Sequence, residues 1–165
     1  MPVALLYPRE LNIATVNFRC YYDPSDGKLH GGPVWDFDNS MARTTGVYAD
    51  PYHALIESGD RNGNCWLTRL MNFKAFTDEI VRLYNEHKEL FQTENENSIY
   101  ALAFDYYDQL SVSVKCNFTV WEKQLYNTSW NTPKDKSYDG HFGILSDFLM
   151  QRNEFWSYYI PDLKY

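Results

Sequence analysis

Two aspartates separated by one residue give this sequence its clearest chemical signal. Asp36 and Asp38 lie in the run Trp35-Asp36-Phe37-Asp38, at the end of a stretch typical of a strand. Residues two apart on an extended strand point to the same face, so both carboxylates project together. A hard cation such as Mg²⁺ takes oxygen ligands and can also hold a phosphate, which indicates a candidate metal site. The alternative interpretation is an acidic strand end exposed to solvent.

A β-hairpin over about residues 16–38 is predicted to carry these aspartates. Apolar residues without helical periodicity predict its first strand over 16–22. The run Asp23-Pro24-Ser25-Asp26-Gly27 is a strong turn signal, because Pro fixes φ, Asp bonds back to the backbone and Gly accepts positive φ. Residues 28–37 are predicted to be the return strand, which ends at the two aspartates.

Helical periodicity dominates the second half of the chain. Apolar residues three and four apart predict helices over 72–91, 97–110 and 139–159, the first capped by Asn72. Between the hairpin and these helices we expect a long loop with a short helix near Asp50. The apolar stripe expected to face the core from the second helix consists of Ile99, Leu102, Ala103, Tyr106 and Leu110.

These elements predict one α+β domain covering residues 1–165, with a short β-hairpin followed by a mostly helical bundle. The helical part is expected over about residues 66–160, and 165 residues suffice for one hydrophobic core. Aromatic residues make up 18% of the chain, which suits either a helical core or a binding surface. Both interpretations stay open.

Charge and composition exclude two classes of partner. The net charge is −7 and no basic stripe is visible, so nucleic-acid binding is not expected. No stretch approaches the roughly 20 apolar residues of a membrane span, so no membrane partner is expected. The amino terminus has a brief apolar run but no basic region before it, so no signal peptide is predicted.

Cysteine and histidine usage argues against a zinc site. Cys20, Cys65 and Cys116 form no Cys-x-x-Cys pattern, and the four histidines are scattered without ligand spacing. Three buried thiols are expected, with one disulfide and a free thiol as the alternative. The histidines are expected to be structural or solvated.

The run Gly32-Pro33-Val34-Trp35-Asp36-Phe37-Asp38 resembles the carboxy-terminal part of a CotH-type (spore-coat protein H) kinase domain. The preceding turn and the stretch from Trp66 to Leu70 fit the same family. The resemblance covers roughly residues 16–160. It implies part of an atypical protein-kinase-like carboxy-terminal lobe, in agreement with the α+β prediction.

The resemblance also implies an activity, namely transfer of phosphate from ATP to protein serine with Mg²⁺ and ATP as cofactors. Asp36 would be the catalytic metal ligand that binds Mg²⁺ on the ATP phosphates. Asp38 would be a second ligand at the metal and nucleotide, and Asn17 on the preceding strand a third metal ligand. The implied partner is a protein substrate or a coat or cell-surface protein, and the implied location is the spore coat or cell surface.

The chain departs from the family pattern upstream of the hairpin. Only 15 residues precede Val16, too few for a nucleotide-binding lobe, and residues 9–15 contain no aspartate. We therefore expect the chain alone to be inactive as a kinase. The alternative function is a non-catalytic module, derived from such a kinase, that binds a protein or glycan. Apolar hairpin residues such as Tyr21 are expected to be poorly buried, which predicts self-association.

Overall fold

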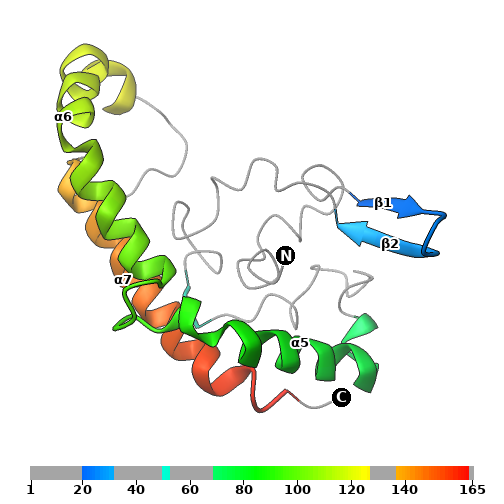
Figure 1. Ribbon diagram of the computed structural model, residues 1–165. Coiled ribbons are helices and arrows are strands. Elements are labelled where there is room, and N and C mark those ends of the chain that lie inside the picture. Colours follow the sequence, from blue (N-terminus) through cyan, green and yellow to red (C-terminus); the bar gives the residue numbers. More distant parts are fainter. Residues whose placement is uncertain (1–19, 32–49, 53–68, 127–136, 164–165) are drawn as a thin grey trace.

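A computed structural model of the chain has a two-stranded hairpin followed by three helices, which confirms the predicted α+β architecture. Figure 1 shows the hairpin apart from the helices, which lie side by side or cross at their ends. The structure describes residues 20–31, 50–52, 69–126 and 137–163, excluding the side chains of residues 20 and 122–126.

The hairpin is antiparallel and closes through the predicted turn. Strand β1 (Cys20–Asp23) pairs with β2 (Lys28–Gly31), and Tyr21 lies opposite His30. Gly27 has φ 69°, a left-handed conformation that costs an L-residue with a side chain more than it costs glycine. The portions of the predicted strands before residue 20 and after residue 31 lie outside the described residues.

Helix α5 (Lys74–His87) continues into the 3₁₀ helix η2 (Lys88–Phe91), as the periodicity predicted. The predicted cap is wrong. Phe73 is the residue before the helix, and no side chain caps it. Asn72 lies one position too early, because its backbone N–H already donates to the carbonyl of Arg69 in the preceding turn.

Helix α6 (Ile99–Tyr126) is much longer than the predicted 97–110 segment, and the prediction is corrected at its end. Polar residues after Leu110 do not stop it. The hydroxyls of Ser113 and Thr119 donate to backbone carbonyls three and four residues earlier, at 2.9 and 2.8 Å, and so remain satisfied inside the helix. The regular backbone is interrupted only at Trp121 (φ −113°, ψ 19°) among the described positions of this helix.

Helix α7 (Tyr138–Tyr159) confirms the third predicted helix within one residue. Its N-cap is Ser137, whose Oγ accepts a hydrogen bond from the backbone N–H of Gly140 at 3.0 Å. Figure 1 shows α7 running antiparallel along α6, with α5 crossing the carboxy-terminal end of α7. The two long helices therefore form one layer. Helices α5 and η2 pack against the carboxy-terminal end of α7 in this layer.

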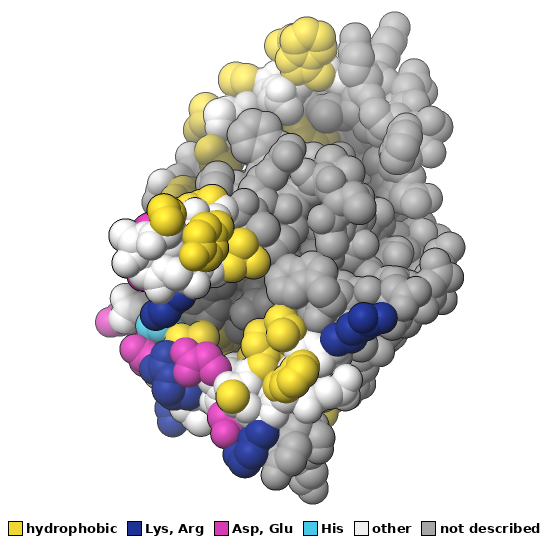
Figure 2. All heavy atoms as spheres, turned by 90° about the vertical axis from the view of Figure 1, so that its right-hand side faces the viewer, with side chains coloured by type: hydrophobic (Ala, Val, Ile, Leu, Met, Phe, Trp, Pro, Cys, Tyr) yellow, Lys and Arg dark blue, Asp and Glu magenta, His cyan; other side chains and the backbone are white. Residues whose placement is uncertain are grey.

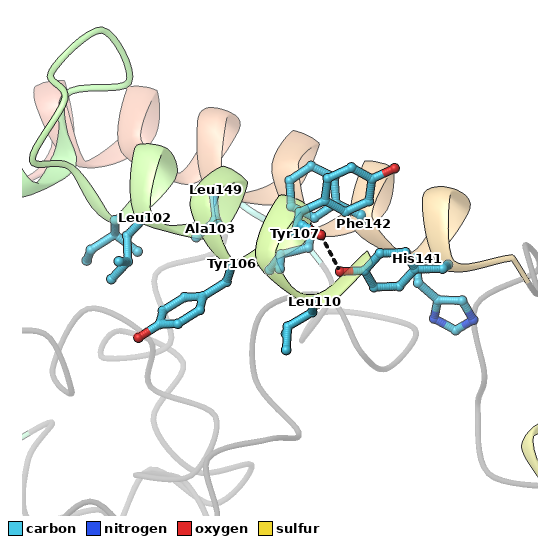
Figure 3. A pocket seen from close by; sticks show the side chains of 11 residues that line it. Leu102, Ala103, Tyr106, Tyr107, Leu110, His141, Phe142 and Leu149 are labelled. Carbon is cyan, nitrogen blue, oxygen red and sulfur yellow. Dashed lines mark hydrogen bonds between the residues drawn. The ribbon is translucent and has the colours of Figure 1, made fainter. Parts of the chain in front are cut away.

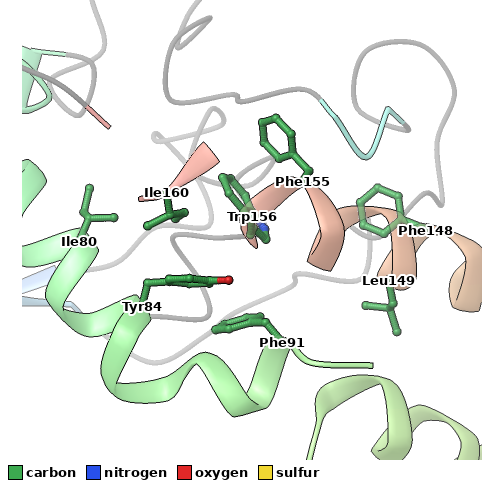
Figure 4. Close-up of a cluster of buried hydrophobic side chains, with 8 residues drawn as sticks. All are labelled: Ile80, Tyr84, Phe91, Phe148, Leu149, Phe155, Trp156 and Ile160. Atoms are coloured by element: carbon green, nitrogen blue, oxygen red, sulfur yellow. The ribbon is translucent and has the colours of Figure 1, made fainter. Parts of the chain in front are cut away.

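The hydrophobic core lies where α5 and η2 meet the second half of α7 (Figure 4). Trp156 is fully buried and Leu149 is 1% exposed. The rings of Tyr84 and Phe91 stack at 5.8 Å between centroids, which joins α5 to η2. The buried hydrophobic residues are Ile80, Tyr84, Phe91, Phe148, Leu149, Phe155, Trp156 and Ile160.

The short described segment at residues 50–52 packs against α7. Tyr52 donates its hydroxyl hydrogen to Glu154 at 3.1 Å, and its ring meets Phe155 edge-on at 6.3 Å. The Asp50 carboxylate accepts the Tyr52 backbone N–H in a turn at residues 51–52, and most of the short helix predicted to begin near Asp50 lies outside the described residues. The rest of the predicted loop lies outside the described residues.

Charged side chains on α5 pair along the helix surface. Arg82 contacts Glu79 at 2.7 Å and Glu86 at 2.6 Å, and such exposed pairs contribute little stability each. Figure 2 shows acidic and basic side chains intermingled on one face of the molecule, with apolar side chains in separate places. Among the helices described, none is both long and apolar enough to cross a membrane.

Candidate functional site

The predicted metal ligands Asn17, Asp36 and Asp38 lie outside the described residues, so their placement remains a prediction. The described element next to them is the hairpin. Strand β2 ends at Gly31, five residues before Asp36. Gly31 is therefore the described residue nearest to the aspartate run on its amino-terminal side.

Two carboxylates shape the hairpin turn. Asp23 Oδ1 accepts hydrogen bonds from the backbone N–H of Ser25 at 2.8 Å and from its hydroxyl at 2.6 Å. These bonds lower the pKa of Asp23, the side-chain bond having the larger effect. Asp26 Oδ1 accepts the backbone N–H of Lys28 at 2.9 Å. Both aspartates thus bond back to the backbone, as the turn signal predicted.

His30 belongs to the same turn, although sequence reasoning treated the histidines as scattered. Its Nε2 lies 2.8 Å from Asp26 Oδ2, and its ring stacks on Tyr21 across the strands at 5.2 Å. One ligand atom each from Asp23, Asp26 and His30 lies within 4.8 Å of the others. Such a set could hold a divalent cation. The bonds above already account for both carboxylates as turn formers.

A second feature is an open groove between α6 and α7, with a volume of about 410 Å³. Figure 3 shows Leu102, Tyr106 and Leu110 projecting from α6 on one side of the helix pair, with Phe142 and His141 coming from α7. We call this feature the α6–α7 groove. It is lined by Ile99, Leu102, Ala103, Tyr106, Tyr107, Leu110, Tyr138, His141, Phe142, Leu145 and Leu149.

The groove corrects the sequence interpretation of the apolar stripe on α6. Leu102, Tyr106 and Leu110 were expected in the core, but they are 51%, 54% and 47% exposed. The reason is the face that α6 offers to α7. Phe142 of α7 stacks on Tyr107 at 4.1 Å, so the helices pack through the neighbouring face and leave the stripe beside the contact.

Acidic side chains act on the tyrosines at one end of the groove. Tyr107 donates its hydroxyl hydrogen to Asp139 at 2.7 Å, and this bond is the main cause of its raised pKa. Tyr138 donates to the backbone carbonyl of Tyr107 at 3.1 Å. Burial, followed by the charges of Asp108 and Asp139, raises the pKa of Tyr138. Two carboxylates therefore lie close to the Tyr107–Tyr138 end.

The structure also describes Arg152 and Cys116, for which the sequence made predictions. Arg152 lies on α7 as the periodicity predicted and is 2% exposed, with its guanidinium over the rings of Phe148, Phe155 and Trp156 at 5.0–5.9 Å. Cys116 is exposed on α6, so the expectation of a buried thiol is wrong there. It lies beyond residue 110, on the part of α6 that was not predicted.

Comparison with known proteins identifies a family. The profile described as CotH kinase protein matches residues 14–156, which is most of the chain. The matched range contains the hairpin, the run with Asp36 and Asp38, and the first two helices with most of α7. No curated protein and no solved structure matches the chain. The resemblance seen in the sequence is confirmed, and the chain belongs to the CotH kinase protein family.

Proposed function

We propose that the chain supplies the metal-binding part of a site for phosphoryl transfer from ATP to protein serine. Asp36 and Asp38 are the magnesium ligands in this proposal, and Asn17 contributes a third oxygen. The observation that carries it is membership of the CotH kinase protein family over a range that includes all three residues.

The donor chemistry supports magnesium. Two carboxylates and one amide oxygen form an all-oxygen set, which suits a hard cation better than zinc or copper. A bound Mg²⁺ would offset the negative charge of the ATP phosphates. The carboxylates of Asp36 and Asp38 would hold it from one face of an extended strand, and Trp35 and Phe37 would alternate to the other face and anchor that strand.

The described hairpin supports this assignment through its well-defined turn. The turn is closed by side-chain bonds from Asp23 and Asp26, and Gly27 provides the positive φ that the turn needs. The turn sets the register of β1 and β2 as far as Gly31, and in this proposal the strand continues from there to the aspartates. Precise placement matters, because phosphoryl transfer relies almost wholly on positioning and electrostatic stabilisation.

Binding of the magnesium–ATP complex is tested first, because this step depends on the proposed metal ligands. The full transfer reaction also needs a lysine that contacts the phosphates and a base that accepts the proton of the serine hydroxyl. Calorimetric titration of ATP with Mg²⁺ should show binding that Asp36→Asn weakens by about tenfold or more. Asp78→Asn is the matched control, since Asp78 is an exposed carboxylate on α5 that pairs only with Lys74 among the described residues.

An affinity for ATP that Asp36→Asn leaves unchanged, or that persists after removal of Mg²⁺, would refute the proposal. Loss of binding in Asp78→Asn as well would show an unspecific charge effect.

Serine phosphorylation is then measured with labelled ATP and a serine-containing coat or cell-surface protein, the substrate class that the family suggests. Label on threonine or tyrosine alone would contradict the serine assignment. Immunolabelling of intact spores and cells would test the proposed location, and a signal confined to the cell interior would contradict it.

A further inference from the structure

We propose that the α6–α7 groove is a docking site for an amphipathic helix of a partner protein, with an apolar stripe and lysine or arginine residues beside it. The groove and its charges carry this inference independently of the proposed phosphoryl transfer.

The dimensions of the groove suit a helix. Its floor on α6 runs from Leu102 to Leu110, eight residues apart, which is about 12 Å along a helix axis. Anchors at positions i, i+4 and i+7 of a docked helix span about 10.5 Å, so three side chains match the length of the floor. A volume of about 410 Å³ accommodates several such apolar side chains.

The exposure of the lining residues indicates a surface suited to a partner. Leu102, Tyr106 and Leu110 are about half exposed and follow one another on a single stripe. Isolated exposed apolar residues need no explanation, but a contiguous stripe over a hollow is typical of interaction sites. The rim is already ordered, because Tyr107 and Tyr138 are stacked at 4.9 Å and hydrogen-bonded. Docking would therefore cost little ordering of the groove itself.

Charge selects the kind of helix. Asp139 accepts the hydroxyl hydrogen of Tyr107 at 2.7 Å, and the charges of Asp108 and Asp139 act on Tyr138 at the same end of the groove. An occupant with basic residues beside its apolar stripe gains electrostatic attraction, whereas an acidic one is repelled. The same repulsion opposes pairing of this face with a second copy.

Three fluorescent peptides of equal length test the proposal against the full 165-residue chain by anisotropy. The first is helical, with leucines at i, i+4, i+7 and i+11 and lysines beside them. The second replaces the lysines with glutamates, and the third keeps the lysines but scrambles the leucines. The first should bind at least about tenfold more tightly than either of the others, and added salt should weaken it.

Two matched substitutions on α6 locate the binding. Leu110→Ser removes an apolar contact of the groove and should weaken the first peptide by about tenfold. Val112→Ser is the control, because Val112 is 71% exposed on the same helix but does not line the groove. Asp108→Asn should weaken the lysine peptide and flatten its salt dependence. Circular dichroism and the urea midpoint of each variant verify that the helices remain folded.

Several outcomes would overturn the inference. If the glutamate peptide bound equally well, the acidic charge near the groove would not select the partner. If the scrambled peptide bound equally well, the attraction would be non-specific and would not depend on an apolar stripe. Equal loss in Leu110→Ser and Val112→Ser would place the contact elsewhere. A dimer in sedimentation that Leu110→Ser abolishes would assign the groove to a second copy of the chain.

Discussion

Two identical side-chain truncations on neighbouring helices should have very different effects on stability. Leu149→Ala removes a leucine that is 1% exposed in the core, whereas Leu102→Ala removes one that is 51% exposed in the groove. Core Leu→Ala substitutions cost about 2–5 kcal/mol, because lost burial adds to an unfilled cavity. The Leu102 side chain is only half buried, and the space that its removal leaves is open to solvent. We therefore expect Leu102→Ala to lower the free energy of unfolding by less than about 1 kcal/mol.

Urea unfolding monitored by circular dichroism measures both free energies. With a total stability of about 5–15 kcal/mol, a loss of about 3 kcal/mol in Leu149→Ala lowers the midpoint clearly while the protein remains folded. Thermal unfolding should show a decrease of roughly 6–12 °C. If Leu149→Ala cost no more than Leu102→Ala, the packing of α7 on η2 and α5 would not be the core of this fold, and the reasoning would fail.

Four smaller predictions concern the hairpin turn and helix α7. Gly27→Ala should destabilise the hairpin by about 1 kcal/mol because of its positive φ, although space for a methyl group exists, and faster amide exchange in the turn should report it. Gly143 lies in the middle of α7 with free space for a methyl group, so Gly143→Ala should instead raise the free energy of unfolding in urea by about 0.5–1 kcal/mol. Ser137→Ala should cost about 1 kcal/mol as a lost N-cap, and an unchanged urea midpoint would refute this capping role. Ser25→Ala should raise the pKa of Asp23 in an NMR titration. Because that pKa is lowered in the folded protein, its contribution to stability is present above about pH 4 and lost as the pH falls through the folded pKa.

Local rules predicted the elements that depend on neighbouring residues. The turn at Gly27 follows from residue types whose conformational preferences act within four positions. Helix α7 follows from apolar spacing and ends before Pro161, which cannot continue a helix. The end of α6 was missed because the apolar stripe used for the prediction stops at Leu110, whereas the helix continues with the hydroxyls of Ser113 and Thr119 bonded to its own carbonyls.

Features that depend on tertiary packing were not predictable from periodicity. The stripe on α6 has the spacing of a core face, and only the angle at which α7 packs leaves Tyr106 and Leu110 exposed. The groove joins residues about 30 positions apart, as in the bond between Tyr107 and Asp139. The metal-site prediction rests on the motif around Asp36, which family membership supports and which the described residues do not place.

Paramagnetic NMR with Mn²⁺ and ATP tests the proposed metal site most directly. Gly31 lies five residues before Asp36, at most about 18 Å along the chain, so metal at that site should broaden its amide signal. We predict broadening that disappears when Asp36 and Asp38 are both changed to Asn and persists when Asp23 and Asp26 are. Asn preserves the acceptor atoms that the turn uses. Broadening that survives the first pair of substitutions and disappears with the second would place the metal in the hairpin turn and contradict the proposed site.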